Sequence, residues 1–315
     1  QQFGFRQKHS KGSANCFLLE QIKGSLDKGN VVGAVFLNLK KAFDTVDHCI
    51  LLQKLQQFQF SAAALLWFKS YLEDREQCVK VGTVKSNLSP NDLGVPQGSV
   101  LGPLLFSLYI NDLPDCCQGV NCQLYADDTV IHVSAKTTVL AGQQLTQALH
   151  NISRWLQLSH LTLNTQKTFS VCFSINQRSP DSIFEVHLDH EPIHEVHETK
   201  YLGIILHKHL KFQSQVNHVY RKVKSNLNCF RFIRGELSHH AALLFMHAMV
   251  FSHLSYCITA WSQTSASTLK PVISLYKQAI KIFDKKTMRW HHCDIIQKHK
   301  LFTFENFVNF SILKN

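Results

Sequence analysis

The chain has 315 residues and 45% hydrophobic content, enough for one large or two modest domains with buried cores. No apolar run approaches the roughly 20 residues that span a bilayer, so we expect no membrane partner. The opening residues do not have the pattern of a signal peptide. The ten cysteines form no CxxC pairs, which predicts free thiols rather than a zinc finger or a disulfide framework.

Positive charge is concentrated in the last third of the chain. The formal net charge is +11, and residues 213–315 hold 14 Lys/Arg against 4 Asp/Glu. Residues 1–212 hold 19 Lys/Arg against 18 Asp/Glu. This imbalance fits either a polyanionic partner, whose phosphates Lys and Arg neutralise, or a charge that keeps the chain soluble. Charge alone leaves both interpretations open.

Hydrophobic spacing predicts helices and one buried strand in the first 72 residues. Apolar residues recur every four positions over residues 14–28, which predicts a helix that Gly29 can cap. Residues 31–39 form a continuous Val-rich apolar run, typical of a central strand. Further helices are predicted around residues 50–55 and over residues 62–72.

The middle of the chain predicts strands and one long helix. Residues 77–84 alternate and predict a strand, and residues 121–134 predict two short strands around a turn at Asp127–Asp128. Apolar residues between 145 and 156 recur at spacings of four, three and four, which indicates an amphipathic helix.

The last part of the chain changes from strands to helices. Residues 181–206 predict short strands with turns at Pro180 and at Glu191–Pro192. From Phe212 onward the pattern is helical and basic. A sheet flanked by helices, followed by a helical region, is an α+β order. The four tryptophans are expected in cores rather than as base-stacking platforms.

The segment Tyr125-Ala126-Asp127-Asp128 carries the strongest chemical signal. Adjacent aspartates in a regular strand point to opposite faces, but at the tip of a hairpin both can approach one cation. An isolated Asp pair is usually a solvated turn. Here it follows a Gly- and Pro-rich turn at residues 94–98, where an apolar helix begins with Ser99 as a candidate cap.

Several segments together resemble the reverse transcriptases of non-LTR retrotransposons, in the order that this family has. The matching segments are QFGFR at 2–6, FLNLKKAFDTVDH at 36–48, GVPQGSVLGPLLF at 94–106, YADD at 125–128, LNTQKT at 163–168 and YLGI at 201–204. The resemblance covers nearly the whole chain, and GVPQGSVLGP with YADD at this spacing is very specific.

The resemblance implies an α+β fold, with a right-hand polymerase palm built on a mixed or antiparallel sheet with flanking helices, and then a helical thumb. Its implied boundaries are a finger remnant at 1–30, the reverse transcriptase palm at 31–175, primer-grip hairpins at 176–212 and a basic helical thumb at 213–315.

The resemblance also assigns roles to single residues. Asp127 and Asp128 are implied as catalytic ligands of two Mg²⁺ ions, which hard carboxylate oxygens suit. Lys167 corresponds to a lysine suggested to protonate pyrophosphate. The resemblance implies that Phe43, Gln97 and Gly98 bind the nucleotide. It implies that Tyr201, Leu202 and Gly203 form the primer grip. Phe43 would crowd the sugar 2′ position. Three of these residues also have a purely structural alternative: Phe43 as a core residue, Gln97 as a turn residue and Lys167 as a solvated surface charge.

Asn38 departs from the family pattern, which has the first catalytic aspartate at this position. An amide oxygen can ligate Mg²⁺ but carries no charge, and the amide NH₂ cannot ligate. Losing most of one ion's contribution corresponds to roughly a thousandfold in rate. We interpret the chain as a degenerate copy that is inactive as an enzyme. His207 also departs, because the family usually has an Asp there.

Two further departures concern what surrounds the matched segments. The first methionine is Met246, and we expect the chain to be a fragment. The family has a finger segment before QxGFR, with an arginine that meets the triphosphate, and often an endonuclease domain. The sequence matches neither, and we expect the missing N-terminal fingers to impair the enzyme in addition to Asn38.

The implied ancestral activity is RNA-directed DNA synthesis at a nicked target, with an RNA template, a DNA primer and dNTPs, in the cytoplasm and nucleus. A second hypothesis is a catalytically dead module that binds RNA or an RNA–DNA hybrid. A third is a fragment that does not fold stably. His187, His190, His194 and His197 have metal-like spacing on a helix, but Pro192 interrupts them, so scattered surface histidines are predicted. The same interpretation is given to His239–His240 and His291–His292.

Overall fold

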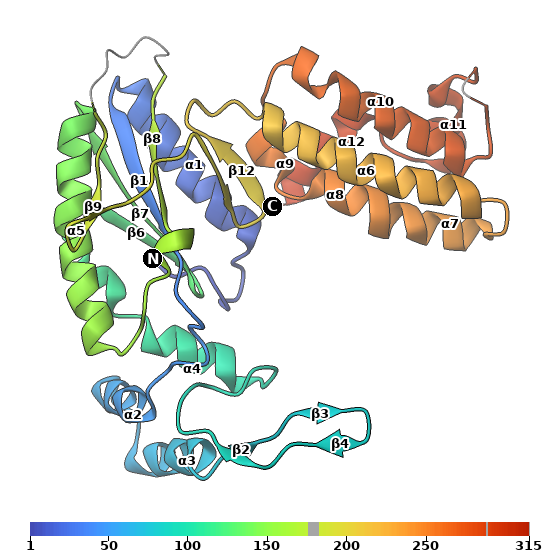
Figure 1. Cartoon of the computed structure of the whole chain (residues 1–315). Helices are drawn as coiled ribbons and strands as arrows, with labels where there is room; N and C mark the ends of the chain where they lie inside the picture. Colours follow the sequence, from blue (N-terminus) through green and yellow to red (C-terminus); the bar gives the residue numbers. More distant parts are fainter. Residues whose placement is uncertain (176–182, 288, 315) are drawn as a thin grey trace. The chain divides into compact units, whose positions relative to one another are not determined.

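The computed structural model describes residues 1–175, 183–287 and 289–314, with the side chain of Lys314 outside the description (Figure 1). The chain divides into two compact units. Unit 1 comprises Gln1–Ser10 and Ile22–His197, and unit 2 comprises Lys11–Gln21 and Glu198–Asn315. Helix α1 (Lys11–Asp27) therefore contributes to both, and each unit is described by itself.

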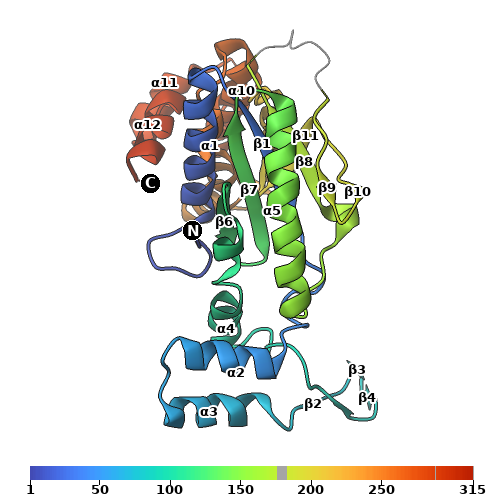
Figure 2. The same cartoon turned by 90° about the vertical axis from the view of Figure 1, so that its left-hand side faces the viewer.

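Unit 1 is built on a four-stranded antiparallel sheet in the order β6-β7-β1-β8. The strands are β6 (Asn121–Tyr125), β7 (Asp128–Ala135), β1 (Val31–Leu37) and β8 (Phe169–Phe173). All of β1 except its first residue is buried, as its continuous apolar sequence predicts. Helix α5 (Thr138–Leu158) lies along the sheet (Figure 2) and buries its apolar stripe against β1 and β7. The predicted amphipathic helix and central strand are both confirmed.

Short helices extend unit 1 beyond the end of the sheet. They are α2 (His48–Gln57), α3 (Ala62–Leu72), α4 (Leu101–Tyr109) and the 3₁₀ turns η1 (Leu113–Cys116) and η2 (Thr165–Lys167). Asp47 and Ser61 cap α2 and α3 by accepting from Ile50 N and Ala64 N. The cap position of α4 is Val100, which makes no side-chain capping bond, one residue after the predicted Ser99. The Ser99 hydroxyl still accepts from Gly102 N at 2.9 Å in the first turn. Trp67 on α3 is 55% exposed, against the prediction of a core position.

The strand predicted over residues 77–84 is wrong as one strand. The chain instead forms two small hairpin pairings, β2 (Glu76–Gln77) with β5 (Ser89–Pro90) and β3 (Lys80–Val81) with β4 (Val84–Lys85). Gly82 turns the chain between β3 and β4 with φ of +60°. Val79 and Val81 are 68% and 75% exposed. No core therefore buries one face of this segment, which would be needed to stabilise a single extended strand.

The turn predicted at Glu191–Pro192 is also misplaced. Pro192 lies in β10 (Glu191–Pro192) and pairs with His187 of β9 (His187–Leu188). Asp189 and His190 form the turn, with φ of +46° and +73°. A two-stranded ladder tolerates proline on its outer edge. The segment forms strands, as predicted for this histidine-rich stretch, while the turn predicted at Pro180 lies outside the described residues.

Unit 2 begins with a hairpin and continues as helices. The hairpin consists of β11 (Glu198–Tyr201) and β12 (Ile204–His207). The helices are α6 (Gln213–Ile233), α7 (His239–Met246), the π-helical η3 (His247–Phe251), α8 (Ser252–Ser255), α9 (Ile258–Trp261), α10 (Ala266–Phe283), α11 (His292–His299) and α12 (Phe304–Lys314). The helical pattern predicted after Phe212 is confirmed.

The core of unit 2 is aromatic. Phe230, Trp261, Tyr276 and Phe283 are fully buried, and α6 packs against α10. Trp290 is 49% exposed and does not belong to this core, again against the prediction. Across the described residues, no helix has both the length and the apolar character that crossing a bilayer requires.

Candidate functional site

The Asp127–Asp128 pair lies at the tip of the β6–β7 hairpin in unit 1. Tyr125 pairs with Asp128, so Ala126 and Asp127 form the two-residue turn. The turn lies one residue earlier than predicted, because Asp128 already belongs to the ladder of β7. Ala126 adopts a left-handed φ of +55°. Both aspartates are half-buried and adjacent at a bend, which allows two carboxylates to serve one cation.

The N-terminal segment holds this hairpin from the side. Phe3 N donates to Leu124 O at 2.8 Å, and Gln2 forms a parallel bridge with Leu124. The side-chain oxygen of Gln2 accepts from Gly4 N at 2.7 Å and from Ala126 N at 3.3 Å. A Cβ atom on Gly4 would lie 2.4 Å from Ala126 N, so only glycine allows this close approach.

These contacts explain part of the QFGFR motif as support for the turn. Gln2 supplies the acceptor for the turn's backbone, and Gly4 supplies the space. The sequence flagged the motif but gave no sign of its partner, which lies 124 residues away.

Asn38 lies directly after β1 and is half-buried. Leu37 pairs with Thr129, so Asn38, which follows Leu37, and Asp128, which precedes Thr129, lie at the same end of these two strands. The backbone of Asn38 is fixed by the LNTQKT segment: its oxygen accepts from Asn164 N at 2.7 Å, and its N–H donates to Thr168 Oγ1 at 3.3 Å. The structure therefore brings the degenerate position and the aspartate pair to the same end of the sheet.

Lys167 ends η2 within the same LNTQKT segment and is exposed. Its backbone N–H donates to Asn164 O at 3.0 Å. Because Asn164 also donates to Asn38 O, the segment that carries Lys167 is anchored at the end of β1.

A second cluster joins the two loops that carry Phe43 and Gln97. Val95 N donates to Phe43 O at 2.9 Å, and Gln97 Nε2 donates to Asp44 Oδ1 at 2.6 Å. The ring of Phe43 stacks on Phe106 at 4.4 Å and meets Phe5 edge-on at 6.5 Å. Phe43 is therefore partly buried against the core and partly exposed to solvent. Sequence reasoning missed the role of Asp44 as the partner that orients Gln97.

Gly98 follows Gln97 and is exposed, with open space where a Cβ atom would lie. A backbone without a side chain here leaves room for a ligand to approach the main chain closely.

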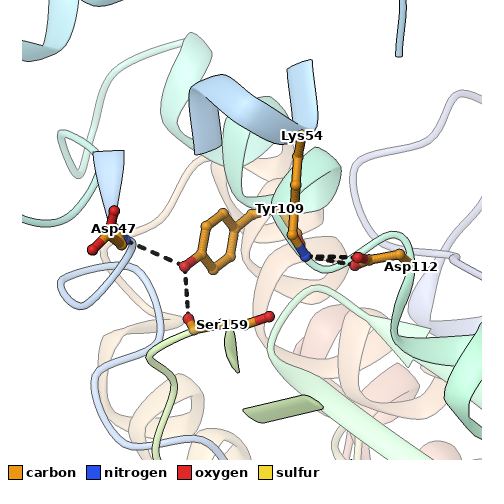
Figure 3. Close-up of polar contacts among 5 residues, drawn as sticks. All are labelled: Asp47, Lys54, Tyr109, Asp112 and Ser159. Atoms are coloured by element: carbon orange, nitrogen blue, oxygen red, sulfur yellow. Dashed lines mark hydrogen bonds and ion pairs between the residues drawn. The ribbon is translucent and has the colours of Figure 1, made fainter. Parts of the chain in front are cut away.

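A polar network in unit 1 supports the second loop cluster (Figure 3). Tyr109 of α4 donates its hydroxyl proton to Ser159 O at 2.6 Å and accepts from Asp47 N at 3.4 Å. Burial raises the pKa of Tyr109 to about 12, so it remains a phenol. Asp47 in turn caps α2 and lies 3.0 Å from His160 Nδ1. The loop that ends with Asp47 is therefore tied to α4 and to the end of α5.

Lys54 of α2 is the buried cation of this network. Its Nζ lies 2.7 Å from Asp112 Oδ1 and donates to Tyr109 O at 2.8 Å, below the rings of Tyr109 and Trp155. Burial lowers the pKa of Lys54, and Asp112 opposes that shift. Sequence reasoning missed this pair, because a charge on a short amphipathic helix normally indicates a solvated face.

The primer-grip candidates lie in unit 2, at the tip of the β11–β12 hairpin. Tyr201 pairs with Ile204, and the turn residues Leu202 and Gly203 have φ of +43° and +84°. Leu202 O accepts from the hydroxyl of Tyr256 at 2.7 Å and from Asn15 Nδ2 at 3.4 Å. These three predicted residues are held together, with Tyr201 and Leu202 buried.

His207 ends β12 opposite Glu198. Burial lowers the pKa of His207, Glu198 opposes this, and nearby His209, Lys211 and Lys208 lower it further. Its Nδ1 accepts from His209 N at 3.0 Å. The histidine thus closes a local turn at the end of the hairpin.

The donor chemistry at the β6–β7 tip fits a hard divalent cation, with a deficit of charge. Asp127 and Asp128 offer carboxylate oxygens, the ligands that Mg²⁺ prefers, and Asn38 offers at most an uncharged amide oxygen. Two carboxylates suit one ion better than the pair of ions that three carboxylates would hold.

Comparison with known proteins identifies the family. Residues 1–206 match the family described as reverse transcriptase (RNA-dependent DNA polymerase). The RNA-directed DNA polymerase from mobile element jockey of Drosophila melanogaster is 32% identical over 237 residues, covering 72% of this chain and 25% of that protein. Its counterpart from Drosophila funebris is 27% identical over 290 residues, covering 89% of this chain and 31% of that protein.

Among solved structures, the apo telomerase of Candida tropicalis aligns with a TM-score of 0.48 and 13% sequence identity, over 97% of this chain and 54% of that chain. The chain spans less than a third of the length of the jockey relatives. The family match extends over the QFGFR, YADD, LNTQKT and YLGI segments alike. The chain therefore belongs to the reverse transcriptase family, as a reverse transcriptase domain of the non-LTR retrotransposon type.

Proposed function

We propose that unit 1 is the palm of an RNA-directed DNA polymerase whose catalytic capacity is impaired by Asn38. One observation carries this proposal: the β6–β7 tip with Asp127 and Asp128, the end of β1 with Asn38, and the LNTQKT segment with Lys167 meet at one end of the sheet. Such convergence of separate motifs is what a metal-dependent nucleotidyl transfer site needs.

Each residue has a definite part in this proposal. Bound Mg²⁺ would supply activation of a primer 3′-hydroxyl and stabilisation of the leaving pyrophosphate. Asp127 and Asp128 would hold the cation, and Lys167 would deliver a proton to the pyrophosphate. Phe43 and Gln97 would contact the nucleotide. Asp44 orients Gln97, since Gln97 Nε2 donates to Asp44 Oδ1 at 2.6 Å. Gly98 leaves space for its phosphates.

The substrates follow from the family. Reverse transcriptases use divalent metal ions and RNA templates, and we propose an RNA template, a DNA primer and dNTPs for this chain. In unit 2 we propose that Tyr201, Leu202 and Gly203 grip the primer and that the helices from α6 onward form the thumb. Synthesis at nicked nuclear DNA, after assembly in the cytoplasm, completes the proposal.

Asn38 sets the expected level of activity. With one carboxylate replaced by a neutral amide, the site loses charge that both metal positions would share, and the rate falls by roughly a thousandfold. We therefore expect no detectable DNA synthesis by the chain as it stands.

A first experiment measures cation binding, which does not depend on template or primer. Titration with Mn²⁺, followed by electron paramagnetic resonance, compares the chain with Asn38→Asp and with Asp128→Asn. We expect Asn38→Asp to bind at least ~10-fold more tightly and Asp128→Asn to bind more weakly, because cation affinity follows carboxylate count. The matched control is Asn87→Asp, which adds the same charge to an exposed segment and leaves binding unchanged.

A second experiment measures primer extension on an RNA template with Mg²⁺ or Mn²⁺. Extension by Asn38→Asp and not by the unaltered chain supports impairment at this one position. Robust extension by the unaltered chain contradicts the impairment.

The alternative function is a catalytically dead module that binds RNA or an RNA–DNA hybrid. Its supporting observation is the basic charge of residues 213–315, with 14 Lys/Arg against 4 Asp/Glu. Salt-dependent binding of the RNA–DNA hybrid that survives Asp128→Asn, without extension by Asn38→Asp, favours this module over the polymerase.

A further inference from the structure

Three consecutive residues at the start of α11 bring metal-binding atoms together. The ligand atoms of His291, His292 and Cys293 all lie within 4.8 Å of one another. Cys293 Sγ is 3.9 Å from His292 Nε2, and the two imidazole rings are 4.8 Å apart between centroids. Among the residues that the structure describes, no other group of three or more His, Cys, Asp or Glu side chains converges in this way.

These separations are close to those of a metal complex. Zinc bonds of about 2.3 Å to sulfur and about 2.0 Å to nitrogen, at tetrahedral angles, put ligand atoms roughly 3.5 Å apart. His291 and Cys293 are exposed and His292 is half-buried, so small rotations of surface side chains are enough to close the set.

The ligand types define the cation. One thiolate with two imidazoles suits Zn²⁺, Co²⁺ and similar first-row cations, whereas Mg²⁺ prefers oxygen ligands. Because the ligands lie at the surface, water would be able to take the fourth position, as in three-ligand zinc sites.

The surrounding charges both help and oppose such a cation. Burial and the nearby Lys277, His291 and Lys281 lower the pKa of His292. Lys277 and Lys281 of α10 repel a cation, as does Lys286, which lies over the Trp290 ring. Asp294 in the first turn of α11 carries a negative charge, which would attract a cation. On binding, the Cys293 thiol releases its proton to solvent, and the thiolate then offsets part of the repulsion.

A separate clamp already defines the far end of α11. Asp284, just after α10, contacts Lys298 Nζ at 2.8 Å and His299 Nε2 at 2.6 Å. The start of α11 carries no comparable ion pair among the described residues, and the three ligands lie there.

From this geometry we propose that His291, His292 and Cys293 bind one Zn²⁺-class cation, which fixes the first turn of α11. The proposed ligands differ in kind from the carboxylate and amide oxygens of Asp127, Asp128 and Asn38 in unit 1, and all three lie within unit 2.

The primary test is a Co²⁺ titration of the purified chain, read as sulfur-to-cobalt charge-transfer absorption. We expect one equivalent to bind with a thiolate band that Cys293→Ser abolishes. The control is Cys229→Ser, which removes another exposed thiol of unit 2 and leaves the band intact. A band that survives Cys293→Ser, or no band in the unaltered chain, overturns the proposal.

Zinc competition against a chromogenic chelator measures each ligand's share. His292→Gln and His291→Gln should each weaken Zn²⁺ by at least ~10-fold, since even outer partners of metal ligands contribute 10–100-fold. His240→Gln, an exposed histidine of α7, should change nothing.

An alkylation measurement needs no variant and so does not depend on whether a variant folds. Zn²⁺ should slow modification of Cys293 at least ~10-fold while Cys229 reacts at its usual rate, read by peptide mass spectrometry. Equal rates for Cys293 with and without Zn²⁺ would count against the site.

Discussion

Two hairpins of this protein share a local design and differ in what they present. In β6–β7 the turn follows Tyr125, and in β11–β12 it follows Tyr201; each begins with a non-glycine residue in the left-handed region, Ala126 or Leu202. Each turn is fixed by a residue distant in sequence. Gln2 accepts from Ala126 N in the first, and Tyr256 donates to Leu202 O in the second.

The two turns differ in which of their groups are buried or hydrogen-bonded. In the first hairpin the Ala126 N–H donates to the Gln2 side chain, and Asp127 at the tip is half-buried. In the second, the Leu202 side chain is only 6% exposed and its carbonyl is occupied. A similar turn thus presents charged side chains in one case and a rigid, covered backbone in the other.

The largest expected effect separates the two hairpins by pH. His132 lies in the middle of β7 and is 3% exposed, and burial lowers its pKa from 6.5 to about 4. As the pH falls from 6.5 to 4, the unfolded chain binds a proton that the folded chain excludes. Stability is therefore lost over that window, by about 3 kcal/mol in total.

Urea unfolding of the chain and of His132→Gln across this pH range tests the effect. The amide does not titrate, so the difference in unfolding free energy between the two should change by about 3 kcal/mol between pH 7 and pH 4. His207→Gln in the other hairpin should change it less, because His207 is less buried. Parallel pH profiles for the chain and His132→Gln would mean that His132 is solvated.

The next effect concerns the support of the first hairpin. Gly4→Ala puts a Cβ atom 2.4 Å from Ala126 N, a backbone atom that cannot rotate away. We expect a loss of about 2 to 3 kcal/mol in unfolding free energy, as for other overpacked sites, and weaker Mn²⁺ binding because the turn that carries Asp127 shifts.

Gly24→Ala is the matched control. Gly24 lies in α1 with nothing within 4 Å of its would-be Cβ, so the same change should stabilise the helix by about 0.5 to 1 kcal/mol. If Gly4→Ala is as well tolerated as Gly24→Ala, the N-terminal segment does not support the turn.

The sequence was most informative where one segment carries its own signal. The apolar period of α5, the buried run of β1 and the acidic hairpin tip were all predictable, and the tip was misplaced by one residue only. The prediction failed over residues 77–84, because alternation indicates a strand only if a core exists to bury one face. Here the valines are exposed and Gly82 turns the chain.

Partners distant in sequence were beyond such reasoning. Three contacts join residues that are far apart in the sequence: Gln2 with Ala126, Lys54 with Asp112, and Asp44 with Gln97. No local spacing of residues in the sequence predicts such contacts. The segment FLNLKKAFDTVDH was matched to the family without a role for its two aspartates. In the structure Asp44 accepts from Gln97, and Asp47 caps α2 and contacts His160. Polar residues of the family motifs thus divide between candidate ligands and structural support, and only the folded geometry separates the two groups.

The smallest effect tests how the second hairpin is held. Tyr256→Phe keeps the ring beside Gly203 but removes the hydroxyl that donates to Leu202 O at 2.7 Å. We expect a loss of about 1 kcal/mol by urea unfolding, since Asn15 Nδ2 still reaches the same oxygen at 3.4 Å. Tyr220→Phe on α6 is the control, because its hydroxyl makes no hydrogen bond within the described part of the chain.

A double-mutant cycle with Asn15→Ala decides whether the two donors act on one acceptor. Either donor alone keeps the Leu202 carbonyl satisfied, so the double variant should lose more than the sum of the single losses, because only then is a buried carbonyl left bare. Additive losses would mean that the carbonyl is hydrated whenever one donor is absent. The tip of this hairpin would then be open like that of β6–β7, and the contrast between a presented and a covered turn would fail.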